Sequence, residues 1–288
     1  MYYPRPILQD MPFHIKKIIT DLADIESRFS LRNTCKELRQ IIDNSSIFYK
    51  EVRLDVIAGD KFLLTAKKGR SGETAQLVSA SVSRILNHLE VILKNPNAHF
   101  DQFAFNQGVV DALEPFKILL TSLQYRLSVE YLVLDVLLDE EDLLTLLPCF
   151  EPETLTSINL GNLLEEDMSR VAELEQWKQA KEAMLDGCTL FIDKLLHFQN
   201  LGLYGEYYLF PGHVETILTH AIRHGNNFKC WEIYQVEMDE EIYEVFGEEA
   251  LIEVPHCDHR LRLFCEQDKF RLESTKYYGE ASSDEEDM

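Results

Sequence analysis

The sequence predicts a mixed α+β and α/β fold, in which a small N-terminal helical module precedes a strand–helix solenoid that ends in a short antiparallel meander. Helical spacing of apolar residues over Met11–Asn44 predicts the module. Short apolar strands that alternate with helical segments between Phe103 and Gln235 predict the solenoid. An apolar content of 45% with 27% charged residues is ordinary for a globular chain of 288 residues, so a sizeable core is expected.

The helical module has two apolar rows. The first comprises Ile15, Ile18, Ile19 and Leu22, and the second Leu31, Cys35, Leu38 and Ile42. Asp24 precedes the second row and can cap a helix there, because its carboxylate accepts the free amide protons of the first turn. Two or three helices this short are marginal alone, so they need the rest of the chain or a partner protein to cover their apolar faces.

A β-hairpin is expected over Lys50–Lys68, where apolar and charged residues alternate on both sides of an Ala58-Gly59-Asp60 turn. The stretch Lys67–Gly72 is basic and predicts a flexible loop without the ending of a phosphate-binding loop. A strong helix is predicted over Ala75–Lys94, because its apolar residues keep the helical period and Asn95-Pro96 stops it.

A strand–helix unit then recurs. The predicted strands are Phe103–Phe105, Tyr131–Val136, Thr156–Leu160, Lys181–Leu185, Gln199–Tyr204 and Phe228–Gln235. The predicted helices between them are Val110–Ser122, Glu140–Leu147, Glu165–Trp177 and Gly212–His224. The strand centres lie roughly 20 to 30 residues apart, which is the period of leucine-rich-repeat-like units with parallel strands.

The C-terminal part is predicted to change character. Leu251–Val254, Arg260–Cys265 and Lys269–Glu273 are short alternating segments that predict an antiparallel meander. Residues 276–288 are acidic and rich in small residues, so a disordered tail is expected. The expected boundaries are therefore 5–48 for the helical module, 49–74 for the hairpin and connector, 75–275 for the large domain and 276–288 for the tail.

Charge is distributed unevenly along the chain. Residues 1–70 hold 13 Lys and Arg against 9 Asp and Glu, whereas the remainder holds 15 against 41, within a net charge of −22. Phosphate backbones repel such an acidic surface, so nucleic acid is not expected as a ligand. A basic protein partner would be steered toward it, although solubility alone explains acidity in many proteins.

No membrane span or secretory signal is expected, because no apolar run approaches roughly 20 residues and the start lacks a basic region followed by an apolar core. The six cysteines form no CxxC pair. Together these features predict reduced, mostly buried thiols and a location in the cytosol or nucleus.

No catalytic or metal site is predicted. His220 and His224 are four apart, but Ala221 stands where a zinc protease helix requires Glu. The cluster His256-Cys257-Asp258-His259 places its ligands on successive positions of a turn, where they point apart. Neither nucleophile signatures nor cofactor motifs occur, so the chain is expected to be non-catalytic, with no cofactor.

A protein-binding face can be predicted from strand alternation. If the leucines, Ile158, Trp231 and Ile233 of the strands face the core, their neighbours face outward. The expected target-binding residues on that face are Tyr131, Val133, Asp135, Asn159, Tyr204, Glu232 and Tyr234. Aromatic residues among acids suit a protein ligand.

The N-terminal residues resemble an F-box. The Met11-Pro12 pair, the Ile-rich helix and the run from Ser30 to Asp43, SLRNTCKELRQIID, carry the resemblance. The chain departs from the commonest pattern at Leu38, where many F-boxes have Trp. An F-box implies docking on the Skp-family adaptor of a cullin-based ubiquitin ligase. The resemblance assigns this contact, or its supporting core, to Met11, Pro12, Ile15, Ile18, Leu22, Leu31, Cys35 and Ile41.

The large domain is similar to the FTH domain of nematode F-box proteins, the F-box A-like family. The stretch Glu173–Lys181, ELEQWKQAK, carries this resemblance together with Leu146-Leu147-Pro148. The family places an F-box before the FTH domain, and its FTH domain is taken to recognise protein partners. The family has no catalytic residues, so none is implied.

The expected function is that of a substrate-recognition subunit of an SCF-type (Skp–cullin–F-box) E3 ubiquitin ligase, which marks a protein target for ubiquitin-dependent degradation. Its F-box would bind the adaptor and its FTH-like domain the target. One alternative is a non-ligase protein-interaction scaffold with a degenerate F-box. Another is a hydrolase hidden in the C-terminal half. The target is not identified by the sequence.

Overall fold

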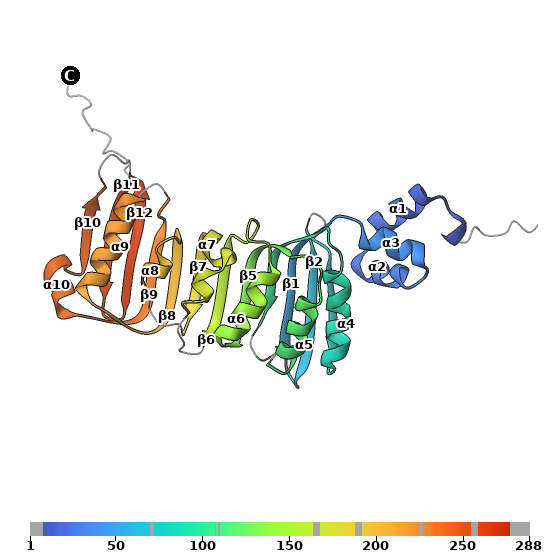
Figure 1. The fold of residues 1–288 in the computed structure, drawn as a ribbon, viewed down its shortest axis with the longest axis horizontal. Coiled ribbons are helices and arrows are strands. Elements are labelled where there is room, and N and C mark those ends of the chain that lie inside the picture. The colour runs from blue at the N-terminus through green and yellow to red at the C-terminus, as the bar shows by residue number, and fades with distance from the viewer. Residues whose placement is uncertain are drawn as a thin grey trace, which may run out of the picture. The chain divides into compact units, whose positions relative to one another are not determined.

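A computed structural model of the chain describes residues 8–69, 72–106, 108, 110–163, 168–187, 192–224, 227–254 and 259–276. The chain divides into two compact units. Unit 1 comprises residues 1–164 and 170–180, and unit 2 comprises residues 165–169 and 181–288. Both units combine helices with a β-sheet (Figure 1).

Unit 1 begins with a helical module made of η1 (Leu8–Asp10), α1 (Phe13–Leu22), α2 (Ile25–Arg32) and α3 (Lys36–Asp43). Asp24 caps α2 as predicted, because its Oδ1 accepts a hydrogen bond from Ser27 N at 2.5 Å. The second predicted apolar row is divided between two helices. Cys35 has an extended backbone, with φ of −157°, and separates α2 from α3.

The sheet of unit 1 has the strand order β6-β5-β4-β1-β2-β3. Its strands are β1 (Ile47–Ile57), β2 (Lys61–Lys68), β3 (Thr74–Ser79), β4 (Ala98–Phe105), β5 (Ser128–Leu138) and β6 (Ser157–Leu163). Strands β1, β4, β5 and β6 are parallel, whereas β2 and β3 are antiparallel to their neighbours. The predicted hairpin is confirmed, and its turn uses positive φ at Gly59 and Asp60.

Helices of unit 1 lie in front of its strands in Figure 1. They are α4 (Val82–Leu93), α5 (Val110–Thr121), α6 (Glu140–Leu146), η2 (Leu147–Cys149), η3 (Val171–Glu173) and α7 (Glu175–Gln179). Stacked aromatic rings fill the core between α5 and the sheet. The rings of Phe105 and Phe116 lie 4.4 Å apart, and both side chains are fully buried.

Two predictions for unit 1 were wrong. The predicted helix from Ala75 instead begins with strand β3, which pairs with β2 through partners such as Leu64 and Leu77. The helix α4 starts only after Ser81, whose Oγ accepts a hydrogen bond from Arg84 N at 3.4 Å. The helix predicted over Glu165–Trp177 is replaced by the short η3 and α7, and its first residues, 165–167, lie outside the described residues.

The sheet of unit 2 has the strand order β10-β11-β12-β9-β8-β7. Its strands are β7 (Glu182–Asp186), β8 (Asn200–Leu209), β9 (Cys230–Met238), β10 (Glu249–Glu253), β11 (His259–Glu266) and β12 (Lys269–Lys276). Strands β7, β8 and β9 are parallel, and β10 to β12 form the predicted antiparallel meander. The last strand, β12, pairs with β9, so β10 occupies the outer edge.

The helices of unit 2 are α8 (Ile192–Leu195), α9 (Pro211–Arg223) and α10 (Glu240–Phe246). The short helices α8 and α10 were not predicted. Trp231 of β9 is fully buried, and its Nε1 donates to Phe198 O at 3.1 Å. The acidic tail predicted over 276–288 lies outside the described residues except for Lys276, which belongs to β12.

No helix in the described part of the chain has the length and apolar character that crossing a membrane requires. The cysteines predicted to be mostly buried differ among the described residues. Cys265 is buried, whereas Cys35, Cys149 and Cys230 are partly exposed, and all four are free thiols.

Candidate protein-interaction surfaces

Helix α1 turns an apolar row outward. The row consists of Met11, which immediately precedes the helix, and Ile15, Ile18 and Leu22. Ile18 is 52% exposed and Leu22 is 81% exposed, while Met11 and Ile15 are partly exposed. These residues are spaced by four, three and four, so they lie on one side of the helix. An exposed apolar row of this kind marks a surface for a protein partner.

The side of α1 that packs on the module is polar. Lys16 is only 3% exposed and Thr20 is fully buried. Lys16 Nζ lies 2.5 Å from Glu37 Oε2 of α3, so the buried ammonium group has a carboxylate partner. Burial of a lysine requires such a partner, because an unpaired charge away from water is strongly unfavourable. The amphipathic helix is therefore oriented with its apolar row away from α3.

The remaining residues predicted to bind an adaptor divide into exposed and core positions. Pro12 is exposed, and Leu31 and Cys35 are partly exposed. Ile41 is 6% exposed and, like Leu38, belongs to the core of the module rather than to its exposed surface. The reason is that α3 turns Leu38, Ile41 and Ile42 to the interior.

The helical module is joined to the sheet by a short connection, because only residues 44–46 separate α3 from β1. The buried Asn95, which follows α4, donates to Ser45 O at 2.7 Å. Asn97 donates to Asn44 O at 3.2 Å, and the buried Arg28 donates to Ser45 Oγ. These bonds hold the module against the N-terminal ends of β1 and β4, two interior strands of the sheet.

The open face of unit 1, defined as the side of the sheet with Tyr131, Val133, Asp135 and Asn159, brings four predicted target-binding residues together. The strand register places Tyr131 beside Ser157 and Val133 beside Asn159. Asn159 Nδ2 donates to Tyr131 Oη at 3.3 Å. Among the four predicted residues of this face, Tyr131 supplies the aromatic ring and is hydrogen-bonded to Asn159.

Val133 is a correction to the prediction. It lies on the open face, but its exposed fraction is only 9%. Its strand neighbours, Ala104 and Asn159, flank it in register, so a partner has little of its surface to contact.

Asp135 on the same face is fixed by its surroundings. Asn162 Nδ2 donates to Asp135 Oδ1 at 2.8 Å. Gly161 is paired with Asp135 in register, and a Cβ added at Gly161 would lie 2.3 Å from Asp135 Oδ1. The Asp135 carboxylate therefore occupies the space that a side chain at position 161 would need, so only glycine fits there.

The open face of unit 2, defined as the side of its sheet with Tyr204, Glu232 and Tyr234, is built around stacked rings. The Tyr204 and Tyr234 ring centroids lie 4.5 Å apart at 6°. Lys269 Nζ lies 4.6 Å from the Tyr234 centroid and 3.0 Å from Glu232 Oε1. Tyr234 Oη donates to Glu232 Oε2 at 2.9 Å. Burial raises the pKa of Glu232, but the hydrogen bonds from Lys269 and Tyr234 outweigh it and the net pKa is lowered.

Sequence reasoning missed the cationic part of this face. Arg271 lies beside Glu232 in register, and Phe264 of β11 lies beside Arg271. The Arg262 guanidinium lies 4.6 Å from the Phe264 centroid, and Arg262 Nε lies 2.7 Å from Glu249 Oε1. The alternation of Arg and apolar residues in His259–Phe264, HRLRLF, could have predicted that the arginines of this segment share one face of a strand. Aromatic residues and arginines of this kind are common anchors in protein interfaces.

A cavity of about 510 Å³ in unit 2 is lined by His197, His220, His224 and Asp193, among others. Burial, then the neighbouring His224 and His197, lowers the pKa of His220 to about 4. Within the described residues no group of three or more His, Cys, Asp or Glu side chains could hold a metal ion. Of the cluster His256–His259, only His259 lies within the described residues.

Three of the described thiols, Cys149, Cys230 and Cys265, are not activated. Burial raises the pKa of Cys265 to about 11, and burial also raises the pKa of Cys149 and Cys230. A nucleophilic cysteine needs the opposite shift, because the thiolate is the reactive form. The surfaces that stand out in the described part of the chain are therefore candidate binding surfaces: the apolar row of α1 and the two open faces.

Comparison with known families adds one assignment. Residues 110–249 match the family model described as the FTH domain. The match supports the FTH domain predicted from the sequence, over a shorter range than the predicted 75–275. FTH domains are associated with F-box proteins in general. No curated protein matches the chain.

Proposed function

We propose that this protein is the substrate-recognition subunit of an SCF-type ubiquitin ligase. The helical module would bind a Skp-family adaptor and, through it, a cullin, and the FTH domain would hold a protein target. The ligase partners would supply all catalysis, so the chain itself needs no cofactor. Such a receptor would work in the cytosol or nucleus.

The orientation of α1 carries the proposal. A helix that only completed the core of the module would turn Ile15, Ile18 and Leu22 inward. Here Lys16 and Thr20 take the inward positions, and Ile18 and Leu22 are exposed. This arrangement leaves an apolar row, beside the Met11-Pro12 pair of the F-box-like sequence, available for an adaptor helix.

The FTH match supports the second half of the proposal, because FTH domains are associated with F-box proteins. Each open face offers residues for a target. The face of unit 2 is the better supplied, with two stacked tyrosines, Phe264 and two arginines. Its cations and carboxylates are paired with each other, so it suits a target of mixed charge rather than a strongly basic one.

The adaptor contact can be tested with point variants of the full-length protein. Ile18→Asp combined with Leu22→Asp places two charges in the exposed row without removing a buried group. Binding of a purified Skp-family adaptor, measured by titration calorimetry, is expected to weaken at least 100-fold. Lys17→Gln is the control, because it also makes the net charge of the protein more negative. Lys17 lies on another side of α1, where its described ion pair is with the exposed Asp21.

Adaptor affinity that is equal in the wild type and the double variant, or absent in both, would refute the ligase proposal. Deletion of the N-terminus up to Val52 is a poor test. It would remove half of β1, which lies between β4 and β2 in the sheet. Circular dichroism of the point variants should show an unchanged fold, since both replaced side chains are exposed.

The second candidate is an interaction scaffold whose helical module docks without assembling a ligase. Departure from the common F-box pattern at Leu38 favours it. The two candidates differ in the fate of the bound target. If the double variant loses the adaptor and the amount of target in cells does not change, the scaffold is supported and the ligase is not.

A further inference from the structure

Strand β3 ends the sheet of unit 1, and its outer edge is unprotected. The strand order places β3 last, and the backbone pairing described for it is with β2 alone. Its sequence, TAQLVS, contains neither a charge nor proline. Natural sheets usually blunt an edge with such residues, because unpaired N–H and C=O groups recruit another strand. The terminal strand of unit 2, β10, follows this rule with Glu249 and Glu253.

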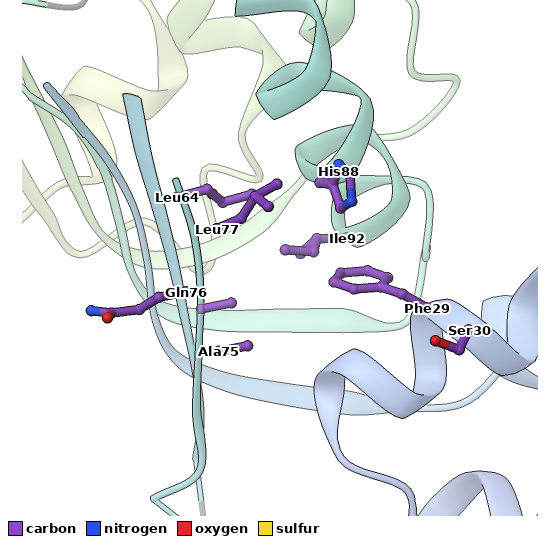
Figure 2. A pocket seen from close by; sticks show the side chains of 9 residues that line it. Phe29, Ser30, Leu64, Ala75, Gln76, Leu77, His88 and Ile92 are labelled. Atoms are coloured by element: carbon purple, nitrogen blue, oxygen red, sulfur yellow. The ribbon is translucent and has the colours of Figure 1, made fainter. Parts of the chain in front are cut away.

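An apolar pocket lies directly beside this edge. It has a volume of about 230 Å³ and is lined by side chains from α2, β2, β3 and α4, among them Phe29, Leu64, Leu77, His88 and Ile92. Figure 2 shows these five side chains around one space. Gln76 also lines the pocket, but its side chain points to the opposite side of β3 in the same view. The pocket is smaller than most small-molecule sites, which occupy roughly 300–1,000 Å³, and it suits one large apolar side chain.

The pocket lies within reach of a strand that pairs with the outer edge of β3. A strand added to β3 would lie about 4.8 Å beyond it, and alternate side chains of that strand would fall on the side of Ala75 and Leu77. Ala75 and Leu77 line the pocket and are only partly buried. A side chain of the added strand would therefore reach the pocket without any movement of β3.

The surroundings of the edge are basic within an acidic protein. Lys67 pairs in register with Thr74 at the start of β3, and Arg84 lies one helical turn before His88 on α4. The stretch Lys67–Arg84, which contains β3, holds four Lys and Arg against one carboxylate, Glu73. Lys67 lies on β2, one strand inward from the edge, and no ion pair is described for the side chains of Lys67 and Arg84, unlike Lys269 on the open face of unit 2. This local excess of positive charge favours a ligand that carries carboxylates.

We propose that β3 binds an extended, acidic peptide of a partner protein as an additional strand, with one large apolar side chain of that peptide in the pocket. This mode combines main-chain hydrogen bonds, which give affinity, with a side-chain pocket, which gives specificity. A second copy of this chain fits less well, because the strand that it would supply, β3, carries no carboxylate to meet these cations. The exposed apolar row of α1 does not line the pocket, although Phe29 and Ser30 of α2 in the same helical module do.

The test uses a phage-displayed library of random twelve-residue peptides, selected on the full-length protein and counter-selected on an Ala75→Phe variant. The added ring enters the pocket from β3. Gln76→Phe is the matched control, because it adds the same ring to the same strand on the other side. Selected peptides are then synthesised, and their affinity is measured by fluorescence anisotropy.

The expected peptides contain one large apolar residue among acidic ones. Ala75→Phe should weaken their binding at least tenfold, and Gln76→Phe less than twofold. Methylation of alternate peptide nitrogens should also weaken binding at least tenfold, because it removes the main-chain donors. Lys67→Glu combined with Arg84→Glu should weaken it further. In the wild type, the bound peptide should slow hydrogen exchange at the amides of β3.

Several results would overturn the proposal. They are a selection without enrichment, enriched peptides without acidic residues, and peptide affinity that Ala75→Phe leaves unchanged. A bound peptide that leaves hydrogen exchange at the β3 amides of the wild type unchanged would also overturn the proposal. This result does not depend on whether the Ala75→Phe variant folds. Sedimentation that shows a wild-type dimer, abolished by Ala75→Phe, would assign the edge to a second copy of the chain instead.

Discussion

The orientation of α1 can be tested through the buried pair between Lys16 and Glu37. Glu37→Ala would leave the Lys16 ammonium group, which is 3% exposed, without its carboxylate 2.5 Å away. Breaking a fully buried pair costs about 3–5 kcal/mol. The Glu37 side chain is 46% exposed, so we expect a smaller loss of about 2 kcal/mol in the stability of α1.

Hydrogen exchange at the amides of α1 is the suitable assay, because it reports local opening rather than unfolding of the whole chain. A loss of about 2 kcal/mol corresponds to exchange that is about 30-fold faster. Lys16→Met removes the buried charge and keeps an apolar stem of similar volume, so its exchange should stay within about threefold of the wild type. Lys16→Met added to the Glu37→Ala variant should return the exchange rate of the α1 amides toward that of the wild type.

Asp21→Ala is the control within the same helix. Asp21 pairs with Lys17 at 3.0 Å, but both side chains are exposed, and such pairs contribute about 0.3–0.5 kcal/mol. Its exchange should therefore change by about twofold. If Glu37→Ala has no larger effect than Asp21→Ala, Lys16 is hydrated and α1 is oriented differently. The exposed apolar row, and with it the basis for the adaptor contact, would then be lost.

Three further predictions concern the sheets and α9. Gly161→Ala should destabilise the protein by about 1–3 kcal/mol, because its Cβ would lie 2.3 Å from Asp135 Oδ1, and Asp135→Ala should restore the loss in chemical denaturation. Trp231→Phe should cost about 1–2 kcal/mol, because it removes the buried hydrogen bond that Trp231 Nε1 donates to Phe198 O. The third concerns pH: the pKa of His220 is lowered from 6.5 to about 4, so the unfolded chain binds its proton first. Stability should therefore fall as the pH drops from 6.5 toward 4, and His220→Gln should flatten that slope in urea titrations.

Each of these predictions has a result that contradicts it. If Asp135→Ala does not restore the stability that Gly161→Ala removes, the added Cβ collides with a group other than the Asp135 carboxylate. An unchanged midpoint for Trp231→Phe would show that water replaces the indole donor. An equal pH slope in the wild type and His220→Gln would assign the pH dependence to other groups.

The strand–helix pattern could be predicted from the sequence because strand alternation and helical period depend on local residues. Leu132, Ile158, Leu203 and Trp231 are all buried as expected from alternation. The stretch ELEQWKQAK was recognised through resemblance, and packing explains part of it. Gln176 Nε2 donates to Phe150 O at 2.8 Å, and Trp177 is buried in unit 1.

The surfaces could not be predicted in full, because they depend on contacts between distant segments. Periodicity placed Ile18 on an apolar face of α1 but did not reveal that Lys16 would be the buried residue, since its partner Glu37 lies 21 residues away. The cation beside Tyr234 is Lys269, from a strand whose register only the folded sheet defines. The segment Ala75–Ser79 fits both helix and strand locally, and pairing with β2 decides it.

The short connection between α3 and β1 has mechanical consequences. A module tethered by a long flexible linker swings freely and transmits no force. Here a pull on the helical module acts lengthwise on β1, an interior strand bonded to β4 on one side and β2 on the other. The backbone hydrogen bonds of β1 to β2 and to β4 then resist the force together, instead of breaking one after another. A partner that pulls on α1 would therefore load the sheet of unit 1 through β1 rather than through a loose linker.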